Sequence, residues 1–260
     1  MGLFENKNVI ITGAAGGIGR GISEAFAKEG ARIVLIDFDE KNLEEFSKKM
    51  SSNNYNLKSY ILDVTNEIMV KKVISKVLED FRKIDILVNG AGVSWMNYNG
   101  KLTEEEWDLN LDVNVKGVWL VTKYVTPHMI DKKEGKIVNI ASMSGKRGGI
   151  FFSHYSASKF AVIGFTQSAA KELAPYGINI NSVCPGWVKT PMQDREIVWE
   201  AKLRNIKNPE DVRTEYIQKT PLSRLCFPKD IANIVLFLAS DKADFVTGQA
   251  INITGGVCMN

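Results

Sequence analysis

Short apolar runs rich in β-branched residues alternate with helical patterns along nearly the whole chain. The apolar runs predict strands at 8–12, 32–36, 59–62, 84–88, 136–140, 178–183 and 250–253. Helical spacing of apolar residues, with a capping-box signal at Thr103 and Glu106, predicts helices at 17–29, 40–50, 68–81, 103–129, 156–173 and 230–240. Strands that are apolar throughout are buried on both faces, and strands separated by helices pair in parallel through right-handed crossovers. The sequence therefore predicts an α/β fold, a single doubly wound parallel sheet of about seven strands with helices on both faces.

The 260 residues contain no linker, repeat or low-complexity tract. A chain of this length is compatible with one large α/β domain, so we expect residues 1–260 to form a single domain. One irregular insertion, at about 187–224, separates the sixth expected strand from the helix that follows it. Segments beyond the carboxyl end of a strand commonly close over ligands, and we interpret this insertion as a substrate lid, called the lid segment below.

Composition and charge argue against several classes of protein. The 33 basic and 30 acidic residues are well mixed, and a net charge of +3 without a basic stripe argues against a nucleic-acid partner. Cys184, Cys226 and Cys258 are isolated and odd in number, which is typical of a reducing compartment rather than of a disulfide framework. The only histidines are His128 and His154, and no Cys-x-x-Cys occurs, so we expect no metal site.

The sequence gives no signal for export or for a membrane. Its N-terminus lacks a basic region followed by a long apolar run, unlike a signal peptide. The most apolar late stretch, 231–239, is too short to span a bilayer. We therefore expect a cytoplasmic protein with no membrane partner.

A glycine-rich turn connects the first expected strand to the first expected helix, with the sequence Thr12-Gly13-Ala14-Ala15-Gly16-Gly17-Ile18-Gly19. Gly13 allows a tight turn, Gly17 lets the backbone approach a pyrophosphate, and Gly19 lets the helix pack close to its strand. The helix N-terminus then offers free N–H groups and a partial positive charge to phosphate. Because the turn lies between a strand and a helix, and a second strand follows, it predicts a Rossmann-type dinucleotide-binding domain.

Asp37 ends the second expected strand and favours NAD as the cofactor. A carboxylate there accepts hydrogen bonds from the adenosine ribose hydroxyls and repels a 2′-phosphate. No arginine follows Asp37 directly, and Gly16 rather than a basic residue precedes Gly17. Asp37 could equally cap the next helix, a role that Asp39 also suits, and Arg20 on the first helix turn is a weaker signal for NADP.

Tyr155 and Lys159 stand four residues apart on an expected helix, where such positions share a face. A nearby ammonium stabilises a phenolate and lowers the phenol pKa from its usual value of about 10. A phenol of this kind can act as a general base in oxidation and as a general acid in reduction. The pair alone is common on protein surfaces, and its meaning depends on the residues around it.

These features, in this order and spacing, resemble the short-chain dehydrogenase/reductase family over nearly the whole chain. Besides the glycine turn and the Tyr155–Lys159 pair, the resemblance includes Asp63-Val64, Asn89-Gly90-Ala91-Gly92, Asn114, Ser142, and Pro185-Gly186 leading to Thr190. It implies an NAD(P)-dependent oxidoreductase that acts on CH–OH groups of a small-molecule alcohol or ketone. It also implies a homotetramer whose interfaces involve the helices around Asn114 and Tyr155 and the C-terminal strand.

The resemblance implies a role for each of these residues. Tyr155 would transfer the proton, Ser142 would hydrogen-bond the substrate oxygen, and Lys159 would hold the nicotinamide ribose and lower the Tyr155 pKa. Asn114 would position a water that links Lys159 to solvent. The residues implied to contact the cofactor are Gly13, Gly17, Ile18, Gly19, Asp37, Asp63, Val64, Asn89, Gly92, Tyr155, Lys159, Pro185, Gly186, Val188 and Thr190. Asp63 could equally be a turn residue, and Asn114 an interior polar group of a helix.

Aromatic and hydroxyl side chains near these positions are candidates for binding the substrate. Serines can bind hydroxyl groups, whereas the aromatic residues could equally fill the core. This mixture favours a small polyhydroxylated ligand over a steroid, and Arg147 or Lys189 could serve a phosphate or lie on a solvated surface. The candidate substrate residues are Ser94, Trp95, Ser144, Phe152, Trp187 and Met192, with Trp199 as a further lid residue.

The region 191–222 and the C-terminal tail resemble polyol members of the family, such as sorbitol-6-phosphate and galactitol dehydrogenases, and acetoin/2,3-butanediol dehydrogenases. We therefore expect an NAD-dependent enzyme that interconverts a secondary alcohol of a polyol, with or without a phosphate, and the corresponding ketone. An acetoin/2,3-butanediol dehydrogenase is the first alternative. A 3-oxoacyl-[acyl-carrier-protein] reductase is the second, but it would favour NADPH and an acidic protein partner, and Asp37 argues against it.

Two other classes fit the sequence less well. A catalytically silent NAD-binding regulator would share the cofactor cleft, but it would not need Ser142, Tyr155 and Lys159 together. A serine hydrolase would need a Gly-x-Ser-x-Gly elbow, which the sequence lacks.

Overall fold

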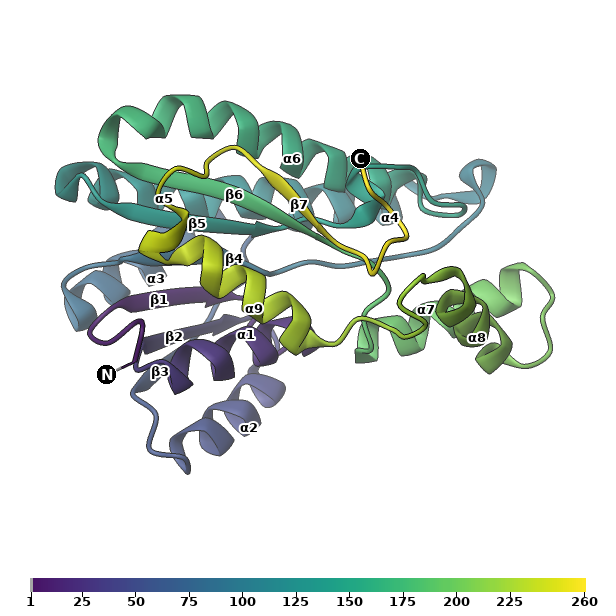
Figure 1. Ribbon diagram of the computed structural model, residues 1–260, viewed down its shortest axis with the longest axis horizontal. Coiled ribbons are helices and arrows are strands. Elements are labelled where there is room, and N and C mark those ends of the chain that lie inside the picture. The colour runs from purple at the N-terminus through teal and green to yellow at the C-terminus, as the bar shows by residue number, and fades with distance from the viewer. Residues whose placement is uncertain (1) are drawn as a thin grey trace.

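Seven parallel strands form one sheet in the order β3-β2-β1-β4-β5-β6-β7 (Figure 1). The structure is a computed structural model that describes residues 2–260. The strands are β1 (Asn8–Thr12), β2 (Arg32–Asp37), β3 (Leu57–Ile61), β4 (Ile86–Asn89), β5 (Gly135–Ile140), β6 (Ile178–Pro185) and β7 (Ala250–Ile253). The prediction of a doubly wound parallel sheet is confirmed.

Helices cover both faces of this sheet. One face carries α1 (Gly17–Lys28), α2 (Glu40–Ser51) and α9 (Pro228–Ala239), and the other carries α3 (Glu67–Phe81), α5 (Gly117–Lys132) and α6 (Ser153–Leu173). Successive strand residues supply the two resulting cores: Val9 and Ile11 belong to the first and Ile10 to the second. Strands buried on both faces are therefore apolar throughout, as the sequence pattern indicated.

The chain reverses its direction of winding at β1, which places a crevice at one end of the sheet. From β1 the sheet grows through β2 to β3 on one side, and from β4 to β7 on the other. In the parallel register, Thr12 lies beside both Ile36 and Asn89. The carboxyl ends of β1, β2 and β4 therefore meet at one edge, where open α/β sheets bind their ligands.

The long helix expected at 103–129 is divided into two helices. It consists of α4 (Glu104–Leu111), one π-helical turn (Asp112–Lys116) and α5. The capping box at its start is present, since Thr103 Oγ1 accepts from Glu106 N (3.2 Å) and Glu106 Oε2 accepts from Thr103 N (3.0 Å). The periodic pattern runs through the wider turn, so the sequence did not reveal the division.

The lid segment contains two helices, α7 (Pro191–Leu203) and α8 (Pro209–Lys219), whereas the sequence analysis expected an irregular segment. Both begin with a capping residue followed by proline: Thr190 caps α7 and Asn208 caps α8. A small core of their own joins them, formed by Ile197, Ala201, Val212, Tyr216 and Leu225. In Figure 1 the two helices project beyond the sheet.

Within residues 2–260, no helix has the length and apolar character needed to cross a bilayer.

Candidate active site

The glycine turn between β1 and α1 has no room for side chains. Gly13 adopts a φ of +66°, and a Cβ atom at Gly19 would lie 2.1 Å from the Gly13 carbonyl oxygen. Gly16 occupies the N-cap of α1, so no side chain from that position competes for the N–H groups of the first turn. Ile18 packs against the core below the turn. The result is a backbone cradle at a helix N-terminus, which suits a phosphate group.

Thr190 brings the start of the lid segment to this turn. A Cβ atom at Gly17 would lie only 2.6 Å from Thr190 Cγ2. The same threonine caps α7, because its Oγ1 accepts from Gln193 N (3.3 Å). The phosphate cradle and the lid are therefore adjacent at a single side chain.

Asp37 lies at the end of β2, beside the glycine turn. Its carboxylate accepts hydrogen bonds from Ala15 N (2.9 Å) and Asp39 N (3.1 Å). Asp39, not Asp37, caps α2 through Asn42 N (3.1 Å). The Arg20 side chain is engaged by neighbouring residues: its Nε donates to Ala15 O (2.7 Å), and its guanidinium lies 5.1 Å from the ring centre of Phe46.

Hydrogen bonds tie the ends of the central strands to the loops after them. Thr12 Oγ1 accepts from Gly90 N (3.1 Å) and Ala91 N (3.2 Å). The Asn89 side chain is buried and donates to Thr122 Oγ1 (3.0 Å) and Asn139 Oδ1 (2.8 Å). It therefore supports the cleft from within the core, whereas the sequence implied that it lines the cleft.

The other residues implied to contact the cofactor lie around the same edge of the sheet. Asp63 is exposed, and its Oδ1 accepts from Thr65 N (2.9 Å), so it forms a turn of its own loop. Val64 is buried against Gly117. After Pro185 at the end of β6, Gly186 N donates to Ile253 O (3.0 Å). Val188, at the start of the lid segment, is buried in the core and forms an isolated bridge with Cys226.

Tyr155 and Lys159 lie on α6 and share a face, as the spacing predicted. Lys159 Nζ is 5.6 Å from the centre of the Tyr155 ring and donates to Ile140 O (3.0 Å) at the end of β5. Ser142 lies two residues after the end of β5, and its Oγ accepts from Ser144 N (3.0 Å). Gly92 lies beside the group, because a Cβ atom there would be 3.5 Å from Lys159 Nζ. The strand end and the helix face thus bring a phenol, an ammonium and a hydroxyl to one place.

Asn114 occupies the π-helical turn and is fully buried. Its Nδ2 donates to Val93 O (3.0 Å) and Ser158 Oγ (3.0 Å), and its Oδ1 accepts from Val93 N (2.9 Å). Single π turns inside helices frequently occur at functional sites. Here the turn directs one amide to both the loop after β4 and the helix that carries Tyr155 and Lys159.

The pKa values of the pair differ from the sequence expectation. Burial raises the pKa of Tyr155, the charge of Glu196 raises it further, and a hydrogen bond with Ser142 lowers it. Burial also lowers the pKa of Lys159 to about 8. The predicted lowering of the Tyr155 pKa is therefore not found in the protein alone, because desolvation of the phenolate is the largest influence on it.

The predicted substrate residues occupy different places, and Phe152 lies against the phenol. Phe152 precedes α6, and its ring centre lies 5.3 Å from that of Tyr155. Ser144 is 9% exposed, next to Ser142. Trp95, in the loop after β4, packs on Trp199 of α7 at a centroid distance of 4.5 Å.

Glu196 contacts the predicted substrate residue Ser94 and was not identified by the sequence analysis. It lies on α7, is half-buried, and accepts a hydrogen bond from the Ser94 hydroxyl. Burial raises the pKa of its carboxyl group to about 7. A signal was present in the sequence, since Met192, Glu196 and Trp199 are spaced four and three residues apart and share a face of α7.

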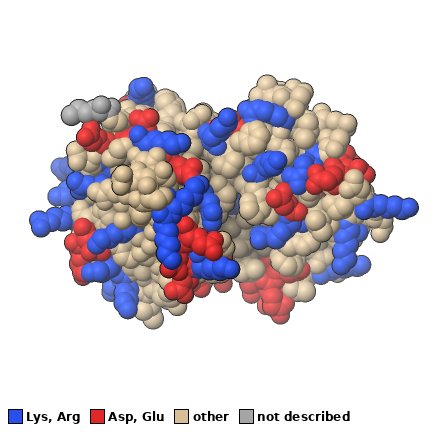
Figure 2. Space-filling model, turned by 90° about the horizontal axis from the view of Figure 1, so that it is seen from below, with Lys and Arg blue, Asp and Glu red and all other residues tan. Residues whose placement is uncertain are grey.

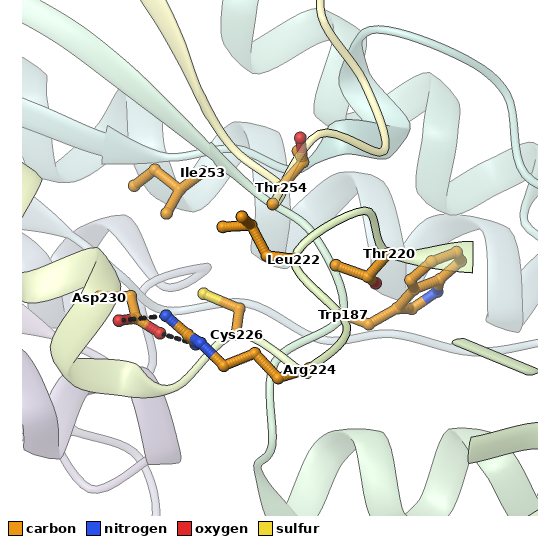
Figure 3. Close-up of a pocket in the computed structure, with 9 residues that line it drawn as sticks. Trp187, Thr220, Leu222, Arg224, Cys226, Asp230, Ile253 and Thr254 are labelled. Carbon is orange, nitrogen blue, oxygen red and sulfur yellow. Dashed lines mark hydrogen bonds and ion pairs between the residues drawn. The ribbon is translucent and has the colours of Figure 1, made fainter. Parts of the chain in front are cut away.

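Trp187 lies with the core of the lid segment and not on Trp95. Its ring stacks on Tyr216, with a centroid distance of 4.4 Å and an interplanar angle of 7°. It also lines a small pocket at the base of the lid segment, where Arg224 pairs with Asp230 in the pocket lining (Figure 3). The structure therefore gives Trp187 a role in packing the lid segment.

Comparisons with known proteins agree with this geometry. Residues 7–201 match the family model of the short chain dehydrogenases. The chain is 40% identical to the 3-oxoacyl-[acyl-carrier-protein] reductase FabG of Thermotoga maritima over 98% of both chains. Among solved structures, an NAD⁺-bound xylitol dehydrogenase superimposes with a TM-score of 0.93, 33% identity and coverage of 97% of this chain and 99% of that one. Actinorhodin polyketide ketoreductase with NADPH superimposes with a TM-score of 0.94, 33% identity and coverage of 96% and 97%.

A dinucleotide cradle at the edge of a doubly wound sheet, next to a Ser–Tyr–Lys group, defines an NAD(P)-dependent oxidoreductase that acts on CH–OH or keto groups. The chain belongs to the short-chain dehydrogenase family.

Proposed function

We propose that the protein is an NAD-dependent dehydrogenase that interconverts a secondary alcohol of a polyol and the corresponding ketone. The observation that carries this proposal is the contact between α7 and the loop after β4. There the Trp95–Trp199 pair forms an apolar wall, and Glu196 with Ser94 provides a polar group next to it. A sugar alcohol has C–H groups that pack on indole rings and hydroxyls that bond to carboxylates, so both parts of this contact suit it.

In this proposal the residues of α6 and β5 handle the proton of the reacting hydroxyl. Ser142 holds the substrate oxygen, and Tyr155 accepts the hydroxyl proton during oxidation and returns it during reduction. The nicotinamide cofactor, when bound, accepts or donates the hydride and in its oxidised form contributes a positive charge. Lys159 positions the nicotinamide ribose, and Asn114 orders the polar path between Lys159 and the loop after β4.

The surroundings of Asp37 support NAD over NADP. A carboxylate at the end of β2 suits the ribose hydroxyls and repels a 2′-phosphate. The one basic side chain on the first turn of α1, Arg20, is engaged with Ala15 O and the Phe46 ring. The xylitol dehydrogenase with the same fold was solved with NAD⁺.

A 3-oxoacyl-[acyl-carrier-protein] reductase is the second candidate, because the Thermotoga maritima relative carries that name at 40% identity. Such an enzyme docks an acidic protein and would gain from a coherent basic surface. On the face shown in Figure 2, basic and acidic side chains are interspersed. Together with Asp37, this distribution favours the polyol dehydrogenase. An acetoin/2,3-butanediol dehydrogenase would be an enzyme of the same kind with a narrower range of substrates.

We also propose that the chain acts as one catalytic domain in a cytoplasmic homotetramer. Large apolar side chains are exposed on the helices that the family resemblance assigns to interfaces: Trp107 on α4, Trp119 on α5 and Phe160 on α6. Burying them against other copies would remove apolar surface from water. Light scattering coupled to size-exclusion chromatography tests the subunit number.

Initial rates with NAD and NADP test the proposed activity. The substrates are sorbitol, galactitol, xylitol, sorbitol 6-phosphate, 2,3-butanediol and an acetoacetyl thioester. We expect oxidation of alditols or diols with NAD, and a fall in kcat of about 10³-fold in Tyr155→Phe, whose ring is retained without its proton-transferring hydroxyl. NADH binding, followed by fluorescence, should be unchanged in this variant. Turnover of the thioester alone, with NADPH, would replace the proposal with the second candidate.

A further inference from the structure

One face of α7 contacts the loop after β4 through three successive positions. Glu196 accepts from the Ser94 hydroxyl, the Trp199 ring packs on Trp95, and the Leu203 carbonyl accepts from the Tyr98 hydroxyl (2.8 Å). The three α7 positions are three and four residues apart, so they lie on one stripe of the helix. The two tryptophans and the tyrosine supply the packing, which leaves the carboxylate as the chemically distinct member of the contact.

Two acidic residues of the lid segment have no ion pair among residues 2–260: Asp211, which is exposed and accepts from Asn208 Nδ2, and Glu196, which is half-buried. Arg204 pairs with Glu200 and Glu215, both at 2.8 Å. Arg213 likewise pairs with acids of α7 and α8, namely Asp194 and Glu210. A half-buried carboxylate without an ion pair costs folding free energy, so its retention calls for another partner.

The position of Glu196 identifies that partner as a ligand of the catalytic cleft. Its partner Ser94 directly follows Val93, whose backbone bonds to Asn114, and Asn114 bonds in turn to Ser158, the neighbour of Lys159 on α6. The charge of Glu196 also raises the pKa of the Tyr155 phenol, in agreement with this placement. Ser94 binds its Oε1, and in the described part of the chain no protein donor bonds to its Oε2. The Trp95–Trp199 wall lies one helical turn further along the same face. A free carboxylate oxygen next to an apolar wall suits a hydrogen-bond donor of the substrate.

We propose that Glu196, held by Ser94, is the specificity residue that binds a second, neutral hydroxyl next to the reacting carbon and disfavours an anionic group at that position. This proposal rests on the proposed polyol or diol activity and adds a substrate requirement to it: a vicinal diol unit without a phosphate or carboxylate beside it. The selection arises because the carboxylate accepts from a hydroxyl but repels another anion.

A purely structural role for the Ser94–Glu196 contact makes a different prediction. If the hydrogen bond served only to hold α7 in place, losing it would weaken the binding of every substrate to a similar extent. Glu196→Gln keeps an oxygen that accepts from Ser94 and removes the charge, whereas Ser94→Ala removes the hydroxyl and keeps the carboxylate. The two variants therefore separate the charge of the carboxylate from the contact itself.

The experiment compares three probes that differ in one substituent: 2,3-butanediol, 2-butanol and 3-hydroxybutanoate, each with saturating NAD at about pH 9, where a carboxyl group with a pKa of about 7 is ionised. We expect Glu196→Gln to lower kcat/KM for the diol about tenfold, the difference between a charge-assisted and a neutral hydrogen bond. Its kcat/KM for 2-butanol should stay within about twofold, and that for 3-hydroxybutanoate should rise. The acid limb of the pH profile should also move to lower pH, because the carboxylate no longer raises the Tyr155 pKa.

Asp194→Asn is the matched control, since it makes the same chemical change on an exposed side chain of α7. It should leave the diol to mono-alcohol ratio unchanged. An equal loss for diol and mono-alcohol in Glu196→Gln would overturn the specificity proposal while leaving the proposed function intact. A wild-type enzyme that oxidises alditols and diols no better than 2-butanol would instead refute the proposed function, and the specificity proposal with it.

Discussion

The cofactor edge of the sheet and the lid segment are positioned by different kinds of interaction. At the cofactor edge, backbone atoms approach each other so closely that a Cβ atom at Gly19 would lie 2.1 Å from the Gly13 carbonyl oxygen. In the lid segment, side chains make the contacts: Arg204 bridges α7 and α8 through Glu215, and Trp187 stacks on Tyr216. The first arrangement tolerates almost no added atom, whereas the second consists of separate contacts that can be exchanged one at a time.

This difference has a functional consequence. A backbone cradle binds the phosphates that all dinucleotide cofactors share, so its geometry must be preserved. Exposed ion pairs and single stacking contacts each contribute modestly to stability. Residues of a lid built from such contacts can therefore be substituted, and the substrate preference changed, without loss of the fold. We expect substitutions at the cofactor edge to be severe and general, and those in the lid segment to be mild and substrate-dependent.

The largest effect is expected from Gly19→Ala at the cofactor edge. The added methyl group would overlap the backbone of Gly13 and Ala14, neither of which can move without disturbing β1. We expect a loss of about 3 kcal/mol in the free energy of unfolding, together with loss of detectable NADH binding. Urea unfolding and NADH fluorescence measure the two effects.

Gly164→Ala provides the control for this change. Gly164 lies within α6, and no heavy atom outside its own helix lies within 4 Å of the position of an added Cβ atom. Here alanine should stabilise the helix by about 0.5–1 kcal/mol and leave NADH binding unchanged. If Gly19→Ala behaved in the same way, the cradle would be less rigid than its geometry indicates.

The cofactor edge could be predicted from the sequence because local physics determines it. Continuous apolar strands, buried on both faces, gave the sheet, and the glycine spacing after Thr12 gave the turn. Neighbouring residues at helical spacing placed Tyr155 beside Lys159. In each case the information lies within one strand, one turn or one helix.

The lid and the π-helical turn depend on contacts between distant parts of the chain. Asn114 bonds to Val93 and Ser158, and nothing in the local pattern of 103–129 indicates a wider turn there. The hydrogen-bond partner of Glu196 is Ser94, which lies 102 residues earlier, so the local sequence could not reveal this contact. The apolar residues of α7 and α8 are not gathered on one face, so periodicity did not reveal these helices, although their capping residues followed by proline were visible in the sequence.

A smaller effect is expected from Trp199→Ala in the lid segment. Loss of the contact with Trp95 removes about 1 kcal/mol of aromatic packing, which corresponds to a roughly fivefold rise in KM for the alcohol substrate. The KM for NAD should change by less than about twofold, because the cradle is formed by backbone. Steady-state kinetics with each substrate varied in turn measures both values.

Val198→Ala is the neighbouring control, since Val198 is half exposed on α7 and is followed directly by Trp199. It should leave both KM values unchanged. If Trp199→Ala instead weakened NAD as much as the alcohol, the lid segment and the cofactor edge would behave as one unit, and the contrast between them would fail.

The smallest expected effect concerns the stability of the fold at acid pH. A buried histidine on a helix of the sheet and an ion pair of the lid segment should lose their contributions in different pH ranges. His154 on α6 is fully buried, and neither ring nitrogen has a hydrogen-bond partner among residues 2–260. Burial lowers its pKa, and the charge of Glu106 on α4 opposes this shift only in part. The unfolded chain takes up the histidine proton near pH 6.5, above the pKa in the fold, so the free energy of unfolding should fall as the pH drops below that value.

The ion pair of Glu215 with Arg204 should lose its contribution to stability in a lower pH range. The pKa of Glu215 is lowered, so its contribution is lost only as the pH falls below the usual carboxyl range.

His154→Leu should therefore flatten the stability profile between pH 7.5 and 5.5 and leave the decline below pH 4.5 unchanged. One proton contributes at most about 1.4 kcal/mol per pH unit, so the wild type should lose up to about 1 kcal/mol over this range and the variant much less. Leucine leaves no buried nitrogen without a partner, which should also make the variant slightly more stable at pH 7.5. Urea unfolding at pH 7.5, 6.5, 5.5, 4.5 and 3.5 measures the free energies on both sides of these two ranges. An identical slope above pH 5.5 in both proteins would show that another group, and not this buried imidazole, sets the first acid transition.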